Sequence, residues 1–198
     1  HHWWYRRRGY GLGFRWAQAG YVVTIGSRTL AKALDRASKL KFRLADGKPE
    51  LQGMENLSAV QACELAVLTV PYRAHKATLL ELKDALQGKI LVDVTVPLVP
   101  PEVDRVQLPP GQAASLEAQA LLGAGVRVVA AFQNISAEHM RAAEQRIDCD
   151  VLVCGDDAEA RDDVIRLVQA AGMSGLHAGP LANAVAIESL TPVLISLN

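Results

Sequence analysis

The stretch from residue 9 to residue 28 constrains the fold most, because few structures use its order of glycines, helix and strand. Gly9-Tyr-Gly-Leu-Gly13 predicts a glycine-rich turn, and residues 14–19 predict a helix that Gly20 closes. Residues 21–25 are a short run rich in β-branched side chains, which is typical of a buried strand. Turn, helix, glycine and strand in this order indicate the first half of a mononucleotide-binding unit.

The strand at 21–25 ends in Gly26-Ser27-Arg28, and Lys32 follows one helical turn later. In a dinucleotide-binding fold the end of the second strand faces the adenosine ribose. An acidic residue there binds the 2′-hydroxyl of NAD, whereas an arginine accommodates the 2′-phosphate of NADP. Residues 26–32 contain no aspartate or glutamate. Ser27, Arg28 and Lys32 are therefore candidate NADP ligands, and the alternative is that they are turn and surface residues.

Short apolar strands alternate with helices along the rest of the chain. The sequence predicts strands at 65–70, 89–94, 126–131, 150–154 and 176–179, and helices at 30–44, 56–63, 75–86, 113–122 and 137–145. A further helix follows Asp157, and a closing helix starts at Leu181. This alternation favours an α/β, Rossmann-like, doubly wound parallel sheet. We expect one NADP-binding domain at 1–180 and, at 181–198, the truncated start of a C-terminal helical extension.

Composition argues against several classes of protein. Twenty-one basic and 21 acidic residues give a net charge of zero, so no basic excess suggests nucleic-acid binding. No apolar run approaches the ~20 residues of a membrane span, and no segment resembles a secretory signal. The three cysteines lack Cys-x-x-Cys spacing, which suits a reducing cytoplasm, where we expect the protein to act. No metal-ligand spacing is present either, so we expect no metal site.

Five segments resemble the NADPH-dependent F420 reductases, also called F420-dependent NADP reductases. They are Val23-Thr-Ile-Gly-Ser-Arg28, Ala62-Cys-Glu-Leu-Ala-Val-Leu-Thr-Val-Pro71, Asp150-Val-Leu-Val-Cys-Gly-Asp-Asp157, Ala178-Gly-Pro-Leu181 and Glu188-Ser-Leu-Thr-Pro192. The resemblance implies hydride transfer between NADP(H) and the deazaflavin coenzyme F420. It also implies that no side chain acts as an obligatory acid or base, because the protein stacks two rings and the cofactors supply the chemistry. No catalytic residue is therefore named.

The resemblance also implies which residues contact the cofactors. On the NADP side these are Gly9 and Gly11 of the phosphate loop, Ser27, Arg28 and Lys32 around the 2′-phosphate, Val70 and Pro71 after a strand, and Ala137. On the deazaflavin side the candidates are Asn183, Glu188, Ser189 and Thr191. Helix caps, strand ends and packing are the alternative interpretation of these positions. The family usually forms a dimer through its C-terminal region, so a homodimer is a further expectation.

The first eight residues depart from the family pattern, which opens with a strand and then Gly-Gly-Thr-Gly-x-x-Gly-x-Gly. Aligned on Gly9 and Gly11, this chain places Trp4 and Arg6 where the pyrophosphate needs glycines. The first strand is missing as well. His-His-Trp-Trp-Tyr-Arg-Arg can be encoded CAT CAT TGG TGG TAC CGG CGA, which reads Ile-Ile-Gly-Gly-Thr-Gly one base later. We hypothesise that residues 1–8 are out of frame. The alternatives are a divergent start or a remnant of an affinity tag.

The sequence leaves three alternative interpretations of the protein open. The first is another NADP-dependent oxidoreductase with the same half-domain, such as a ferric reductase. The second is a non-catalytic NADP-binding fragment. The third is an inactive product of a damaged gene. Reduction of F420 by NADPH, compared with reduction of chelated iron, separates the two enzymes.

Overall fold

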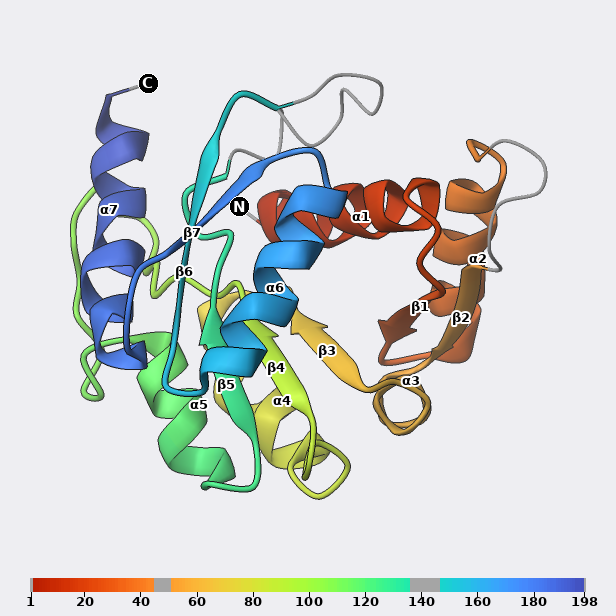
Figure 1. Cartoon of the computed structure of the whole chain (residues 1–198), viewed down its shortest axis with the longest axis horizontal. Coiled ribbons are helices and arrows are strands. Elements are labelled where there is room, and N and C mark those ends of the chain that lie inside the picture. The colour runs from red at the N-terminus through yellow and green to blue at the C-terminus, as the bar shows by residue number, and fades with distance from the viewer. Residues whose placement is uncertain (1, 45–50, 136–146, 198) are drawn as a thin grey trace.

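A computed structural model describes residues 2–44, 51–135 and 147–197, and Figure 1 shows its α/β arrangement. The elements are α1 (His2–Gln18), β1 (Val23–Ser27), α2 (Leu30–Lys41), β2 (Leu51–Glu55), α3 (Asn56–Gln61), β3 (Leu65–Leu68), α4 (Tyr72–Leu82), β4 (Ile90–Asp93), α5 (Ala114–Leu122), β5 (Arg127–Ala130), β6 (Asp150–Gly155), α6 (Ala158–Ala170), β7 (Ser174–His177), the 3₁₀ helix η2 (Leu181–Asn183) and α7 (Ala184–Ser196).

The strands form two sheets, one of two strands in the order β1-β2 and one of five in the order β3-β4-β5-β6-β7. All pairs are parallel except β5 and β6, so the predicted Rossmann-like α/β class is confirmed, with one antiparallel pairing inside it. Only the last residues of β5 and β6 pair, Val129 with Gly155 and Ala130 with Cys154. The rest of β6 and its partner β7 therefore extend beyond the carboxyl edge of β3–β5 (Figure 1).

Helices cover both faces of the five-stranded sheet, as doubly wound folds require. On one face, side chains of α1 and α6 pack with β4, β5 and β6 into one apolar core. On the other face, α4, α5 and α7 pack on the same strands. A third cluster joins α1 and α2 to the two-stranded sheet. The helix α1 thus belongs to the cores of both sheets and holds them together.

The predicted turn at residues 9–13 is wrong, because α1 runs without a break from His2 to Gln18. A turn forms at Gly9 when a strand ends just before it, and the described residues ahead of β1 contain no strand. Gly9 serves instead as a close contact: a Cβ there would lie 2.5 Å from Thr69 Oγ1. Four residues further on, a Cβ on Gly13 would lie 3.2 Å from Ile25 Cδ1. The helix therefore touches both the end of β3 and the strand β1.

The sheets are not joined to each other: β1 pairs only with β2, and β3 only with β4, within the described residues. The sequence indicates that the first strand of the family pattern is missing. The gap between β1 and β3 is where such a strand belongs. In the open sheet of a dinucleotide-binding fold, the first strand lies between the second and the fourth. Those positions are taken here by β1 and β3.

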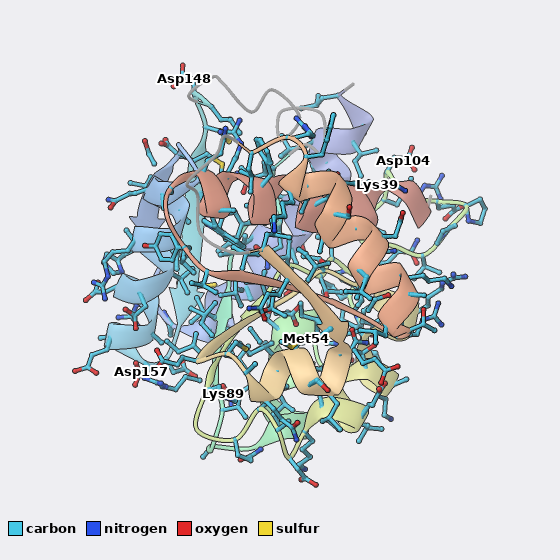
Figure 2. All side chains as sticks on the ribbon, turned by 90° about the vertical axis from the view of Figure 1, so that its right-hand side faces the viewer. Lys39, Met54, Lys89, Asp104, Asp148 and Asp157 are labelled. Atoms are coloured by element: carbon cyan, nitrogen blue, oxygen red, sulfur yellow. The ribbon has the colours of Figure 1, made fainter. Side chains whose placement is uncertain are left out.

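Other predicted elements appear with shifted ends. The helix predicted at 30–44 ends at Lys41, and the strand predicted at 65–70 ends at Leu68. Asp157 caps α6, because its Oδ1 accepts a 2.7 Å hydrogen bond from the amide of Ala160. Figure 2 labels Asp157 at the edge of the molecule. The helix predicted at 137–145 lies outside the described residues. No helix among those described is both long and apolar enough to cross a bilayer.

Candidate functional site

The carboxyl end of β1 carries the three residues predicted to bind a 2′-phosphate. Ser27 ends the strand and is 8% exposed, whereas Arg28 and Lys32 are exposed. Lys32 lies in the first turn of α2, whose N-cap residue Thr29 makes no side-chain cap. Neither cation has an acidic partner within the described part of the chain. A hydroxyl and two uncompensated cations can therefore bind an anion at this strand end.

An acidic residue that sequence reasoning overlooked stands beside this group. Glu55 ends β2 and is the register partner of Ser27. It is also the N-cap residue of α3, without a side-chain cap bond. Its carboxylate is exposed, so it can turn toward solvent and away from a bound anion. The sequence contains no signal for this neighbour, because no strand was predicted at 51–55.

Val70 and Pro71 follow β3 and are half-buried, and Pro71 is the N-cap residue of α4. The close contact between Gly9 and Thr69 brings α1 beside this segment. Gly11 is buried inside α1. The structure therefore gathers Gly9, Val70 and Pro71, while Ala137 lies outside the described residues.

The phosphate loop does not fit a pyrophosphate in this structure. Within an α-helix each N–H bonds to the carbonyl four residues earlier, so the amides of residues 9–13 are already used inside α1. Amides that bind phosphate come from a turn or from the first turn of a helix, where they have no such partner. Ser27, Arg28 and Lys32 can therefore hold a phosphate, whereas the glycine-rich segment cannot bind one in this conformation.

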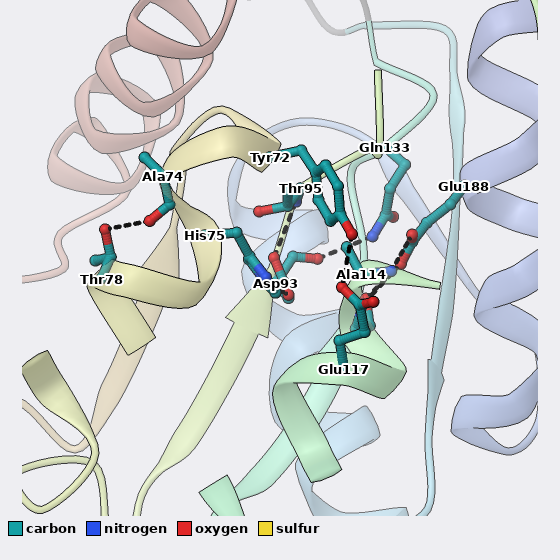
Figure 3. A network of polar contacts seen from close by, with 11 residues as sticks. Tyr72, Ala74, His75, Thr78, Asp93, Thr95, Ala114, Glu117, Gln133 and Glu188 are labelled. Carbon is teal, nitrogen blue, oxygen red and sulfur yellow. Dashed lines mark hydrogen bonds and ion pairs between the residues drawn. The ribbon is translucent and has the colours of Figure 1, made fainter. Parts of the chain in front are cut away.

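A buried polar network lies at the carboxyl edge of β4, and Figure 3 shows its members. His75 Nε2 and Asp93 Oδ2 are 2.7 Å apart, with exposed fractions of 1% and 0%. Asp93 Oδ1 accepts from the amide of Thr95 at 3.0 Å. The side-chain amide of Gln133 donates to the carbonyl of Asp93 at 2.8 Å. Burial lowers the pKa of His75, but the Asp93 carboxylate outweighs this and the pKa is raised.

Glu188, a deazaflavin-side candidate, is 2% exposed and binds the start of α5. Its carboxylate accepts from the amide of Ala114 at 2.6 Å, and from the amide and hydroxyl of Ser115 at 3.0 and 2.7 Å (Figure 3). Burial, followed by the charge of Asp93, raises the pKa of Glu188 to about 7, against the opposing effect of these hydrogen bonds.

The other deazaflavin-side candidates have varied surroundings. Thr191 is buried, and its hydroxyl donates to the carbonyl of Gln133 at 3.0 Å. Asn183 is exposed and its side chain donates to the carbonyl of Ala178 at 2.6 Å. Ser189 is half-buried. Glu188 and Thr191 thus share a buried region, and Asn183 belongs to the surface.

Tyr72 follows Pro71 directly and joins the network from α4. Its hydroxyl donates to Glu117 Oε2 at 2.8 Å, and its ring stacks on His75 with centroids 6.1 Å apart. Burial and the Glu117 carboxylate raise the pKa of the phenol to about 12. Sequence reasoning did not single out Tyr72 or Asp93. A charged residue in the apolar run at 89–94 was the available signal for Asp93.

Comparison with known proteins gives a consistent set of relatives. Residues 7–97 match the family model described as "NADP oxidoreductase coenzyme F420-dependent". The chain is 39% identical to the F420-dependent NADP reductase of Methanothermobacter marburgensis over 196 residues, which cover 96% of this chain and 88% of that relative. It is 33% identical to the metalloreductase STEAP3 of Rattus norvegicus over 180 residues, 90% of this chain but 33% of that relative.

Among solved structures, a putative F420-dependent NADP reductase from Arthrobacter sp. FB24 superposes with a TM-score of 0.73. It is 27% identical in sequence, and the match covers 94% of this chain and 89% of that one. The similarity therefore extends over nearly the whole of both chains.

Proposed function

The chain belongs to the F420-dependent NADP reductase family, and on that premise we propose that it transfers a hydride between NADP(H) and the deazaflavin coenzyme F420. The observation that carries the proposal is the strand end of β1. There a buried hydroxyl and two cations without acidic partners in the described chain suit the phosphate that distinguishes NADP from NAD. The metalloreductase alternative is not favoured, because this chain matches only 33% of that relative.

In this proposal each residue of the strand end has its own task. The Ser27 hydroxyl donates to a phosphate oxygen, and the Arg28 guanidinium forms a bidentate charge-assisted pair with the phosphate. Lys32 adds a point charge from the first turn of α2. Val70 and Pro71, together with Ala137, contact the ribose and nicotinamide side. These assignments agree with the rule that ligands bind at the carboxyl ends of parallel strands.

The two coenzymes supply the redox chemistry when both are bound. The chain's own contribution is to bind and orient them and to exclude water. No side chain has to move a proton, which agrees with a site whose buried acids and histidine are occupied by internal hydrogen bonds. We place the NADP domain at 1–180 and the helical extension at 181–198.

The misfit at the pyrophosphate has a proposed cause in residues 1–8. If they are an out-of-frame reading, the corrected segment supplies Ile-Ile, the end of a strand, and then a Gly-Gly-Thr-Gly turn. The division between β1 and β3 supports this, because one parallel strand placed there would join both sheets. That strand would end before the Gly-Gly-Thr-Gly turn, and the turn would offer backbone amides that have no partner within a helix.

The test is an assay of two acceptors with a chain whose residues 1–8 are replaced by the corrected segment. NADPH should reduce F420, measured as loss of deazaflavin absorbance, and chelated iron should not be reduced. Iron reduction without F420 reduction would reject the proposal. Tight NADP binding with neither activity would favour the non-catalytic fragment instead.

A homodimer through α7 completes the proposal. Ala186, Leu190 and Val193 of α7 and its C-cap residue Leu197 are exposed and apolar at spacings of four, three and four, so they form one stripe. Such a stripe is typical of a helix–helix interface. Light scattering on the purified chain should give twice the 21.3 kDa monomer mass.

The zero net charge and three free cysteines support a cytoplasmic protein that does not bind nucleic acid.

A further inference from the structure

Glu188 is the one carboxylate on α7 and is 2% exposed, and nothing in the hydride chemistry uses it as an acid or base. It has no cationic partner within the described chain. A buried charge without such a partner is costly unless hydrogen bonds compensate it. Three donors from α5 provide that compensation, so the cost is tied to one particular placement of α7.

We propose that Glu188 is a positioning residue, whose carboxylate fixes α7 against α5 and, through the surrounding buried network, against the His75–Asp93 pair of α4 and β4. The proposal rests on the proposed function in one respect: the start of α4 and the face of α7 are where that function puts its two coenzymes. Glu188 then sets how these two sides of the site stand relative to each other.

The first step is the cap that α7 supplies to α5. The N-cap residue of α5 is Ala113, whose methyl group cannot accept a hydrogen bond. Glu188 replaces the missing local acceptor from 73 and 74 positions away, with one oxygen on Ala114 and the other on Ser115. A negative charge at a helix N-terminus also interacts favourably with the helix dipole. Breaking this contact therefore loosens two helices together.

The second step is a contact one turn further along α7. The Thr191 hydroxyl donates to the carbonyl of Gln133. The Gln133 side chain donates to the carbonyl of Asp93, whose carboxylate in turn holds His75 (Figure 3). Residues three apart lie on one face of a helix. Two anchors on that face, Glu188 and Thr191, fix the rotation of α7 as well as its position.

The third step is electrostatic coupling across the network. The Glu188 charge acts on Tyr72 and His75 of α4 and on Cys154 of β6, and it interacts with Asp93 of β4. Glu117 of α5 also faces Tyr72 and His75, and Asp156 and Arg161 face Cys154. The Glu188 charge favours protonation of His75. The pKa of His75, on α4, therefore measures whether the charge of Glu188, on α7, acts across the network.

The first experiment follows His75 by NMR in the ligand-free 198-residue chain, with its signals assigned by comparison with His75→Asn. Glu188→Gln should lower the pKa of His75, because it removes a nearby negative charge that favours the protonated imidazole. Glu159→Gln, which neutralises an exposed carboxylate on α6, is the matched control and should leave it unchanged. An unchanged pKa in Glu188→Gln would overturn the coupling.

The second experiment measures amide hydrogen exchange in the same variants. Glu188→Ala should speed exchange of the Ala114 and Ser115 amides by about tenfold or more, and also loosen α7 and the first turn of α4. Glu188→Gln should restore part of the protection, because its one side-chain oxygen can still accept a hydrogen bond from one of the two α5 amides.

Faster exchange confined to α5 would mean that Glu188 is only a local cap, and the positioning role would be rejected. If Glu188→Ala does not fold, the pKa of His75 in Glu188→Gln still tests whether Glu188 is coupled to the His75–Asp93 pair. Neither experiment uses a coenzyme, so failure of this inference is distinct from failure of the proposed function.

Discussion

Arg28 presents an exposed guanidinium at the end of β1, with no acidic side chain to compensate it among the described residues. A 2′-phosphate accepts two parallel bonds from such a group, whereas the free ribose of NAD brings no charge. The choice between the two dinucleotides should therefore depend on this single side chain more than on any other.

In the chain with a corrected N-terminus, Arg28→Ala should weaken NADP binding by about 1.5–3 kcal/mol, the range for hydrogen bonds to charged groups. NAD binding should barely change. Titration calorimetry with both dinucleotides measures the difference, and Arg105→Ala, which removes an exposed loop arginine, is the control. Equal losses for NADP and NAD would contradict the assignment.

Site residues that are close together in the sequence could be predicted, whereas contacts between residues far apart in the sequence could not. Ser27, Arg28 and Lys32 are close in sequence, so their shared strand end could be predicted from the pattern alone. His75 and Asp93 are 18 positions apart, and Glu188 is 74 from Ala114. Such pairs follow from the way the sheet and helices pack. No spacing rule in one sequence predicts that packing.

The helix α1 is where an element differs most from its prediction. Glycines disfavour a helix interior, so the pattern at 9–13 predicts a turn. The helix forms nonetheless, because its apolar residues pack against both sheets and Trp16 Nε1 donates to the carbonyl of Leu167 at 2.8 Å. Strands made of short β-branched runs bounded by glycine or proline were easier to predict, since such runs have few other structures available. The strand β2 was missed, because Leu51–Glu55 contains no β-branched residue.

Gly9→Ala should destabilise the chain by about 1–3 kcal/mol, as overpacking does. The new Cβ would approach Thr69 Oγ1 to 2.5 Å, and rotation of the threonine does not help because its Cβ and Cγ2 lie at 3.2 and 3.3 Å. Urea denaturation measures the change. In a Thr69→Ala background the same substitution should be neutral or stabilising by up to about 1 kcal/mol, since alanine favours helix. An unchanged cost would show that the contact is not the cause.

The helix α6 offers a separate test of a local cap. Asp157→Ala removes the acceptor for the Ala160 amide and should cost about 0.5–2 kcal/mol in the free energy of unfolding. Asp104→Ala, at an exposed loop carboxylate, should have almost no effect. Chemical denaturation compares them, and equal effects would mean that Asp157 contributes no more than surface charge.

At the scale of the whole molecule, the buried network makes stability depend on pH. The folded pKa of Glu188 is raised from 4.5 to about 7. Its contribution to stability is therefore present in full below about pH 4.5 and is lost as the pH rises through about 7. His75, whose pKa is also raised, acts in the same direction.

Relative to Glu188→Gln, the wild-type chain should lose about 2–3 kcal/mol of unfolding free energy between pH 5 and pH 8, because one unit of pKa shift corresponds to about 1.4 kcal/mol. Urea midpoints of both chains at the two pH values provide the measurement. A difference that does not vary with pH would show that Glu188 keeps its ordinary pKa in the folded protein.

The division between β1 and β3 has a consequence for the behaviour of the chain in a cell. Each strand has one edge whose backbone donors and acceptors pair with no other strand among the described residues. Open edges of this kind recruit strands from neighbouring molecules. A chain with the printed N-terminus should therefore form inclusion bodies on overexpression, whereas one with a strand restored between β1 and β3 should remain dispersed.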